Sequence, residues 1–190
     1  MSFRTAFIII VTGRPAAGKS TLANWLSKEL KLPVVSKDSI REVLFEGLGW
    51  KDRTWAQKLT VVSIELMFHF AQLQLKSGHS IIMDNSFLPS LSTSRFTTLK
   101  KQTGAEIIQI VCDAHSELLF QRFKNRAETG ERHPGHGDFD VLEKLQKGLN
   151  KNLPMLMELG GQVIEVDTTD FSTLKYEDVL EKVRTYVNKD

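Results

Sequence analysis

The chain has 190 residues, of which 41% are apolar and 25% charged, and its 25 Lys and Arg residues nearly balance its 23 Asp and Glu residues. At roughly 100–200 residues per domain, this length predicts a single globular domain over residues 1–190 with a substantial core. The one cysteine, Cys112, excludes an internal disulfide framework and a multi-cysteine zinc site. The net charge of +2 is too balanced to predict nucleic-acid binding, although a local basic face stays open.

The first apolar stretch, Ala6–Val11, is far shorter than the roughly 20 residues that a membrane-spanning helix needs. Gly13, Arg14 and Pro15 follow it, where a secretion signal would continue with apolar residues. We therefore expect a cytoplasmic protein that does not contact a membrane, and the sequence indicates no specific protein partner.

Short apolar runs alternate with helical patterns along the chain. The runs are typical of buried parallel strands and lie at Ala6–Val11, Val34–Val35, Ile81–Met83, Ile107–Cys112 and Val163–Val166. Helices are predicted at Leu22–Leu30, from near Thr54 to Gly78, after Pro89, at Leu118–Phe123, at Val141–Leu153 and around Val179–Val183. This alternation predicts an α/β fold with a parallel sheet, helices on both faces, and ligands at the carboxyl ends of the strands.

The helix near Thr54 is expected to be the longest. Thr54 and Gln57 match a capping box, which predicts where the helix begins. Its apolar residues recur at helical spacing and predict a buried stripe of Trp55, Leu59, Val62, Leu66, Phe70 and Leu73.

A phosphate-binding loop follows the first predicted strand. Residues 13–20 match G-x-x-x-x-G-K-[ST] at every fixed position, with a strand before them and a helix after them. The glycines let the backbone curl so that its N–H groups point at phosphate oxygens, and the helix N-terminus adds its positive end. The residues predicted to hold the nucleotide here are Gly13, Arg14, Pro15, Ala16, Ala17, Gly18, Lys19, Ser20 and Thr21.

Three side chains of this loop are expected to have separate roles. Lys19 would bridge the β- and γ-phosphates and act in catalysis, Ser20 would bind Mg²⁺, and Thr21 would bond the α-phosphate. GTP-specific proteins usually carry N/T-K-x-D after a late strand, and the terminal Asn188-Lys189-Asp190 has the wrong spacing. ATP is therefore the expected nucleotide, with Mg²⁺.

Asp38 and Arg41 follow the second predicted strand, one helical turn apart and on one face. A carboxylate at this place can accept the proton of an attacking hydroxyl, and a guanidinium can hold an acceptor. The alternative is structural: Ser39 and Glu42 would form a capping box, and Asp38 would begin the helix and pair with Arg41.

Asp84 ends the third predicted strand and has three possible roles. Its carboxylate could bind Mg²⁺ through water, contact the acceptor, or form an Asx-turn that starts the following loop. The sequence leaves these roles open.

Arg122 and Arg126 lie four residues apart on one predicted helix face, just before the glycine-rich segment Ala127–Asp138. That segment has no apolar periodicity, and we interpret it as a mobile lid. Lid arginines can stabilise charge on the γ-phosphate, with Arg126 in catalysis, whereas the alternative is a pair of solvated surface arginines. Arg132 has less positional support, and no further Cys or His accompanies His133 and His136 to form a metal site.

Together, the phosphate loop, Asp38-x-x-Arg41, Asp84-Asn85-Ser86 and Arg122/Arg126 resemble the motifs of small P-loop kinases. The pattern is similar to that of polynucleotide 5′-hydroxyl kinases, zeta-toxin-type kinases and chloramphenicol phosphotransferases, over about Ala6–Asp167. The resemblance implies a three-layer P-loop NTPase fold with a five-stranded sheet of order 2-3-1-4-5. It also implies a general base at Asp38, acceptor binding by Arg41, lid arginines on the ATP phosphates, and adenine near Asp167 and Thr168.

The sequence thus predicts an ATP-dependent kinase that transfers the γ-phosphate to a hydroxyl of a small molecule or of a nucleic-acid 5′ end. Asp38, Arg41 and Asp84 would form its acceptor side. The alternative is an ATP-hydrolysing switch or assembly module without a dedicated acceptor, in which Asp38 and Arg41 would be structural.

Overall fold

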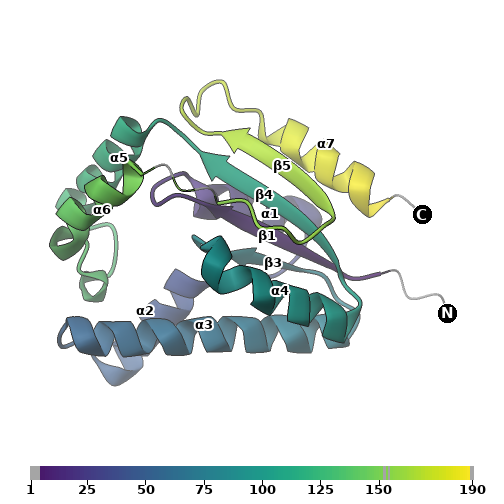
Figure 1. The fold of residues 1–190 in the computed structure, drawn as a ribbon, viewed down its shortest axis with the longest axis horizontal. Helices are drawn as coiled ribbons and strands as arrows, with labels where there is room; N and C mark the ends of the chain where they lie inside the picture. The colour runs from purple at the N-terminus through teal and green to yellow at the C-terminus, as the bar shows by residue number, and fades with distance from the viewer. Residues whose placement is uncertain (1–4, 152, 154, 189–190) are drawn as a thin grey trace.

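The computed structural model describes residues 5–151, 153 and 155–188, so both ends of the predicted domain lie outside the described residues. Five parallel strands form one sheet in the order β2-β3-β1-β4-β5 (Figure 1). The strands are β1 (Phe7–Gly13), β2 (Val34–Ser36), β3 (Ile81–Asp84), β4 (Glu106–Asp113) and β5 (Gln162–Asp167). The predicted α/β fold and the strand order implied by the resemblance are both confirmed.

Helices cover both faces of this sheet. In the described ranges they are α1 (Lys19–Leu30), α2 (Lys37–Leu48), α3 (Arg53–Lys76), α4 (Pro89–Thr103), α5 (Ser116–Thr129), α6 (Leu142–Leu149) and α7 (Tyr176–Val187). The helix expected at Val141–Leu153 is therefore shorter, and residue 152 lies outside the described residues. None of these helices has the length and apolar character that crossing a membrane requires.

The central strand β1 separates two apolar cores because its side chains alternate between the faces of the sheet. Ile9 and Val11 pack with residues of α1 and α7, whereas Ile8 and Ile10 pack with residues of α3 and α4. All four side chains are fully buried. The carboxyl end of β1 is thus fixed from both sides, which gives the phosphate loop a rigid base.

Helix α3 begins one residue earlier than expected. The Asp52 side chain accepts a 2.8 Å hydrogen bond from the Trp55 amide, so Asp52 is the N-cap and the capping box predicted at Thr54 and Gln57 is wrong. Of the predicted buried stripe, Leu59 alone is buried. The residues that face the core are Leu59, Ser63, Met67, Ala71 and Leu75.

The reason is the size of the side chains at the contact. Small residues at Ser63 and Ala71 let the α3 backbone approach its neighbours closely, and Met67 and Leu75 fill the core beside them. The larger residues Val62, Phe70 and Leu73 remain 43%, 49% and 53% exposed. A search for large apolar residues at helical spacing therefore selects the wrong face.

Candidate active site

The carboxyl ends of β1, β2 and β3 open onto a cavity of about 780 Å³. The phosphate loop forms one side, the start of α2 forms a second, and α5 with the segment after it forms a third. The structure brings eleven predicted site residues to this one cavity, whereas Gly13, Arg14 and Ala17 do not line it. The eleven are Pro15, Ala16, Gly18, Lys19, Ser20, Thr21, Asp38, Arg41, Asp84, Arg122 and Arg126.

The phosphate loop has a backbone that only small residues allow. Gly13 has φ 145°, and a Cβ there would lie 1.9 Å from the Cys112 carbonyl oxygen. Gly18 is the N-cap of α1 with φ 71°. The Lys19 ammonium folds back and donates a 2.8 Å hydrogen bond to the Arg14 carbonyl, so it lies over the loop that would hold the phosphates.

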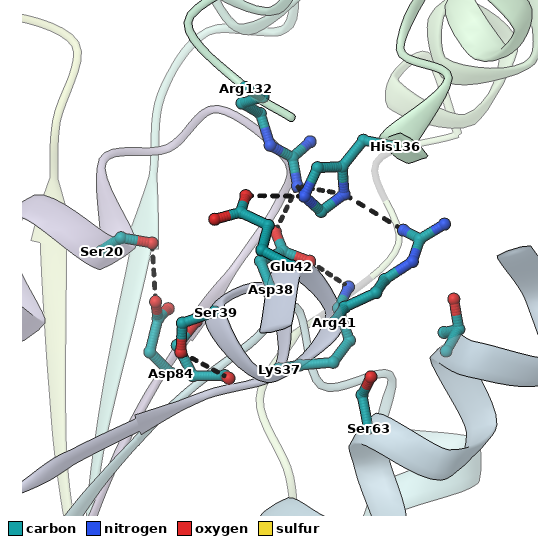
Figure 2. Close-up of polar contacts among 12 residues, drawn as sticks. Ser20, Lys37, Asp38, Ser39, Arg41, Glu42, Ser63, Asp84, Arg132 and His136 are labelled. Carbon is teal, nitrogen blue, oxygen red and sulfur yellow. Dashed lines mark hydrogen bonds and ion pairs between the residues drawn. The ribbon is translucent and has the colours of Figure 1, made fainter. Parts of the chain in front are cut away.

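Ser20 at the start of α1 and Asp84 at the end of β3 face each other. The Ser20 hydroxyl donates a 2.6 Å hydrogen bond to Asp84 Oδ2 (Figure 2). Asp84 is only 3% exposed, and its Oδ1 has no hydrogen-bond partner among the described residues. Burial raises the pKa of this carboxyl, opposed by the Ser20 hydrogen bond and the Lys19 charge.

This pair fits a Mg²⁺ site better than it fits an Asx-turn. The carboxylate points to the Ser20 hydroxyl, and its second oxygen is free to bind a hard cation directly or through water. Within the described ranges, His, Cys, Asp and Glu side chains form no group of three that could hold a metal. A Mg²⁺ ion bound here would take its remaining ligands from the nucleotide and water.

The Arg14 side chain turns away from the cavity, although its backbone belongs to the phosphate loop. Its guanidinium donates to Asp113 Oδ1 at 2.6 Å, to Ser116 Oγ at 2.8 Å and to the carbonyls of Ala114 and Leu149. Arg14 thus fastens the loop to the end of β4 and the start of α5. Any contact with nucleotide would come from its backbone.

Asp38 lies at the start of α2 between two cations. Lys37 Nζ is 2.9 Å from Asp38 Oδ1, and Arg132 Nη2 is 2.5 Å from Asp38 Oδ2. Burial raises the pKa of Asp38, but the charges of Lys37 and Arg132 outweigh it and hold this pKa far below its usual value. The carboxylate is therefore ionised throughout the neutral range.

Only part of the structural alternative agrees with the structure: Asp38 lies in the first turn of α2, but the capping box does not form. Helix α2 begins at Lys37, and the Ser39 hydroxyl donates to the Ser36 carbonyl at 3.1 Å instead of capping the helix. Glu42 bonds to His136, and Arg41 Nη1 lies 3.2 Å from His136 Nδ1; among the described residues, Arg41 forms no ion pair with Asp38. The capping box considered for Ser39 and Glu42 is wrong because both side chains have other partners.

The segment after α5 docks on α2 through two histidines (Figure 2 shows His136). His136 Nε2 lies 2.8 Å from Glu42 Oε1, and His133 Nε2 lies 3.1 Å from Glu46 Oε1. The His133 ring also stacks on Phe45, with 5.0 Å between ring centroids. Residues 127–129 of the predicted lid belong to α5, so the segment that docks on α2 begins after Thr129. We call this segment, residues 130–138, the lid.

Arg122 and Arg126 share the cavity but have different neighbours. Arg126 Nε lies 3.8 Å from Asp138, which also binds Arg132 at 2.9 Å. Arg122 Nη2 instead donates to the carbonyls of Thr168 and Thr169, in the loop that follows β5. Its guanidinium carbon lies 4.3 Å from the centre of the Phe171 ring, which also covers Gly18.

Arg132, His136 and Phe171 line the cavity but received no site role from the sequence. Arg132 and His136 meet α2 across 94 residues of chain, a pairing that no local spacing signals. Phe171 lies in the loop after β5, where adenine was expected near Asp167 and Thr168. The sequence signal that could have indicated these residues is the Arg132-x-x-x-His136 spacing within a glycine-rich segment.

Comparison with known proteins places the chain in a family. The family model described as an AAA domain matches residues 8–151. An uncharacterized protein of Mycobacterium tuberculosis is 28% identical over 130 residues, which are 65% of this chain and 26% of that protein. The chain thus spans about a quarter of the length of the curated relatives it matches.

Solved structures share the whole fold. A Chloroflexus aurantiacus protein, provisionally assigned as a kinase, is 35% identical with a TM-score of 0.85, covering 96% of this chain and 98% of that chain. The APS kinase of Mycobacterium tuberculosis, solved with AMPPNP and APS, has a TM-score of 0.59 at 12% identity, covering 98% and 99%. At that identity the second match shows the fold alone. The family match, the phosphate loop and the strand order agree: the chain belongs to the AAA domain family and has the architecture of a small P-loop kinase.

Proposed function

We propose that this protein is a Mg²⁺-dependent kinase that transfers the γ-phosphate of ATP to a hydroxyl group. The observation that carries the proposal is that one cavity joins the phosphate loop to Asp38 and Arg41. A nucleotide on the loop would present its γ-phosphate toward the side where a carboxylate and a guanidinium stand. This arrangement supports transfer to an acceptor over hydrolysis alone.

The nucleotide end of the cavity is supported by the loop and by Lys19. The backbone N–H groups and the N-terminus of α1 would bind the phosphates, and Lys19 would contact the β- and γ-phosphates. Partial burial lowers the pKa of Lys19, while the nearby Asp84 and Asp38 charges oppose that shift. The ATP-analogue complex of the distant APS kinase is consistent with nucleotide binding to this fold.

Ser20 and Asp84 would hold Mg²⁺. The unpartnered, buried Asp84 Oδ1 and the adjacent Ser20 hydroxyl are oxygen donors of the kind that Mg²⁺ prefers. When bound, the ion would neutralise charge on the phosphates. The protein's own contribution is to hold one oxygen at the start of α1 and the other at the end of β3, beside the loop that would bind the nucleotide.

Asp38 would accept the proton of the acceptor hydroxyl. As the acceptor oxygen bonds to the γ-phosphorus, the bond from that phosphorus to the β,γ-bridging oxygen breaks, ADP leaves, and the hydroxyl proton passes to the Asp38 carboxylate. Arg41 would orient the acceptor, and Arg126 would stabilise the charge on the transferred group.

Arg132 affects how strong a base Asp38 can be. Burial alone raises the pKa of Asp38, and the Lys37 and Arg132 charges lower it. If Arg132 leaves the carboxylate when the acceptor enters, one of the charges that oppose the effect of burial is lost, and Asp38 becomes a stronger base. Arg132 would thus keep Asp38 a weak base until an acceptor is present.

The acceptor wall of the cavity is polar with one large aromatic residue. Beyond Asp38 it is lined by residues of the α2–α3 connection and the start of α3, namely Trp50, Lys51, Asp52, Arg53 and Gln57. Trp50 is 51% exposed. Such a wall suits a polar small molecule or a nucleic-acid 5′ end, because both carry hydroxyls and either can stack on an aromatic ring.

The proposal is tested by transfer of labelled γ-phosphate from MgATP to oligonucleotide ends, sugars, nucleosides and antibiotics. A labelled acceptor that disappears with EDTA would support it. Release of phosphate to water alone, at one rate whatever the acceptor, would instead support an ATP-hydrolysing switch.

A further inference from the structure

We propose that His136 is a positioning residue of the transfer site: its neutral imidazole holds Arg132 on the Asp38 carboxylate and fixes the Arg41 guanidinium beside it. The inference rests on the proposed role of Asp38 and adds a residue that would act only through two arginines. His136 is 8% exposed, and its side chain is the most enclosed of the ionic groups that join the lid to α2.

The contacts of the two ring nitrogens define the protonation state. Nε2 lies 2.8 Å from the Glu42 carboxylate, so it carries the proton and donates it. Nδ1 lies 3.2 Å from Arg41 Nη1, and a guanidinium can only donate, so Nδ1 must accept. The ring is therefore the neutral tautomer with its proton on Nε2.

Arg132 lies against the same ring. Arg132 Nη2 is 3.0 Å from His136 Nδ1 and 3.4 Å from His136 Nε2. The guanidinium thus contacts both ring nitrogens and does not bond to one nitrogen alone. Arg132 Nη2 also lies 2.5 Å from Asp38 Oδ2. A neutral imidazole thus forms one side of the place where Arg132 meets the base, and Figure 2 shows these side chains gathered around Asp38.

A second proton on His136 would disrupt this arrangement. An imidazolium would put a third positive charge beside Arg41 and Arg132 and would replace the Nδ1 acceptor with a donor. The charged groups that face or flank the ring come from α2, from the lid and from α5: Lys37, Asp38, Arg41, Glu42, Arg126, Glu131, Arg132, His133 and Asp138.

The balance of these charges favours the neutral ring. Burial, together with Arg132 and Arg41, lowers the pKa of His136, although Asp38 and Glu42 act in the opposite direction. The pKa of His136 is thus lower when the segment after α5 is docked on α2 than when it is released, where it would be about 6.5. Docking is therefore strongest above about pH 6.5 and weakens as the pH falls below that value. Asp38 stays ionised across this range because its own pKa is far lower. Acid should therefore release Arg132 by protonating His136, without protonating the base.

The test begins with NMR on protein labelled with ¹⁵N at histidine and arginine, without nucleotide or acceptor. The chain has five histidines, and His136→Gln and Arg132→Lys assign the two signals needed. At pH 8 we expect the Nε2-protonated tautomer of His136 and slow rotation of the Arg132 guanidinium. As the pH falls below about 6.5, Arg132 should become mobile in step with the uptake of a proton by His136. Arg132 that stays restrained while His136 protonates would overturn the inference.

Variants separate positioning from general damage to the lid. In His136→Gln the amide can donate to Glu42 and accept from Arg41 but cannot be protonated, so Arg132 should stay restrained from pH 8 to pH 5.5. In His136→Ala, Arg132 should be mobile at both pH 8 and pH 5.5. The control His69→Gln, on the exposed face of α3, should behave as the wild type. An Arg132 that stays restrained in His136→Ala would contradict the inference even if the other variant failed to fold.

The pH profile of transfer completes the test, once an acceptor is identified. Because protonated His136 can no longer accept from Arg41, which would orient the acceptor, the wild type should lose kcat as the pH falls below about 6.5, and His136→Gln should lack this acidic limb. A wild-type limb that persists in His136→Gln would count against the inference. If no acceptor is phosphorylated at all, the proposed function fails. The NMR experiment still tests whether His136 holds Arg132 on Asp38, because it needs no acceptor.

Discussion

Arg132 contacts Asp38 across 94 residues of chain, with 2.5 Å between Nη2 and Oδ2. This contact joins the lid to the residue that we propose as the general base. It places a cation where the acceptor hydroxyl would have to approach. In the kinase that we propose, this contact would have to open before transfer begins.

Asp38→Asn should separate nucleotide binding from transfer. The amide keeps the shape of the side chain but cannot take a proton, so transfer should fall by about 10²-fold or more. ATP binding, measured by calorimetry, should remain nearly unchanged because Asp38 is not among the residues that would bind the nucleotide phosphates. Asp178→Asn, an exposed change on α7, is the matched control. Near-normal turnover of Asp38→Asn would exclude the base assignment.

Asp84→Asn should raise the stability of the protein without ligand and lower its Mg²⁺-dependent affinity for nucleotide. Burial raises the pKa of Asp84, so its ionised form is a cost to the folded state without ligand at neutral pH. We expect the free energy of unfolding at pH 7.5 to rise by about 1–2 kcal/mol, and this gain to shrink as the pH falls through the Asp84 pKa.

The same variant should lose the part of nucleotide affinity that depends on Mg²⁺. Calorimetry with ATP in Mg²⁺ and in EDTA measures that part directly. Equal Mg²⁺ dependence in Asp84→Asn and in the wild type would show that Ser20 and Asp84 do not hold the ion.

Arg14→Met should destabilise the fold without removing a group that contacts nucleotide. The guanidinium is buried and satisfies Asp113, Ser116 and two backbone carbonyls. Losing it should lower the free energy of unfolding by about 2–4 kcal/mol in urea titrations, because those acceptors lose their partner. An unchanged free energy of unfolding would mean that the loop does not depend on this anchor.

Gly135→Ala should undock the lid. A Cβ at Gly135 would lie 2.8 Å from the Phe45 ring, and that ring is only 1% exposed and cannot move aside easily. We expect transfer to fall by about tenfold, the scale of a lost positioning contact. The control is Gly148→Ala in α6, where an added Cβ meets nothing within 4 Å and should raise helix stability slightly. Full activity in Gly135→Ala would show that lid docking on α2 is not needed.

The parts of the site that could be predicted are those encoded in contiguous sequence. The fixed spacing of residues 13–20 carries its own backbone geometry, and Asp38 and Asp84 could be placed because parallel strands end at one edge. The strand order itself came from the resemblance, because alternating apolar runs do not say which strands are neighbours.

The parts that failed depend on partners far apart in the chain. Nothing near His136 indicates that its ring meets Glu42, or that Arg14 turns toward Asp113. The buried face of α3 failed for a related reason, since Ser63 and Ala71 face the core only because the neighbouring surface requires small side chains. Local spacing predicts periodicity, whereas the partner surface decides which periodic face is buried.

The measurement that tests the account most directly is transfer of labelled γ-phosphate from MgATP to the acceptor panel, with wild type and Asp38→Asn side by side. The account predicts a labelled acceptor with the wild type and at least a hundredfold less with Asp38→Asn, while both proteins bind ATP. Label that appears only as inorganic phosphate, at equal rates in the two proteins and whatever acceptor is present, would contradict it.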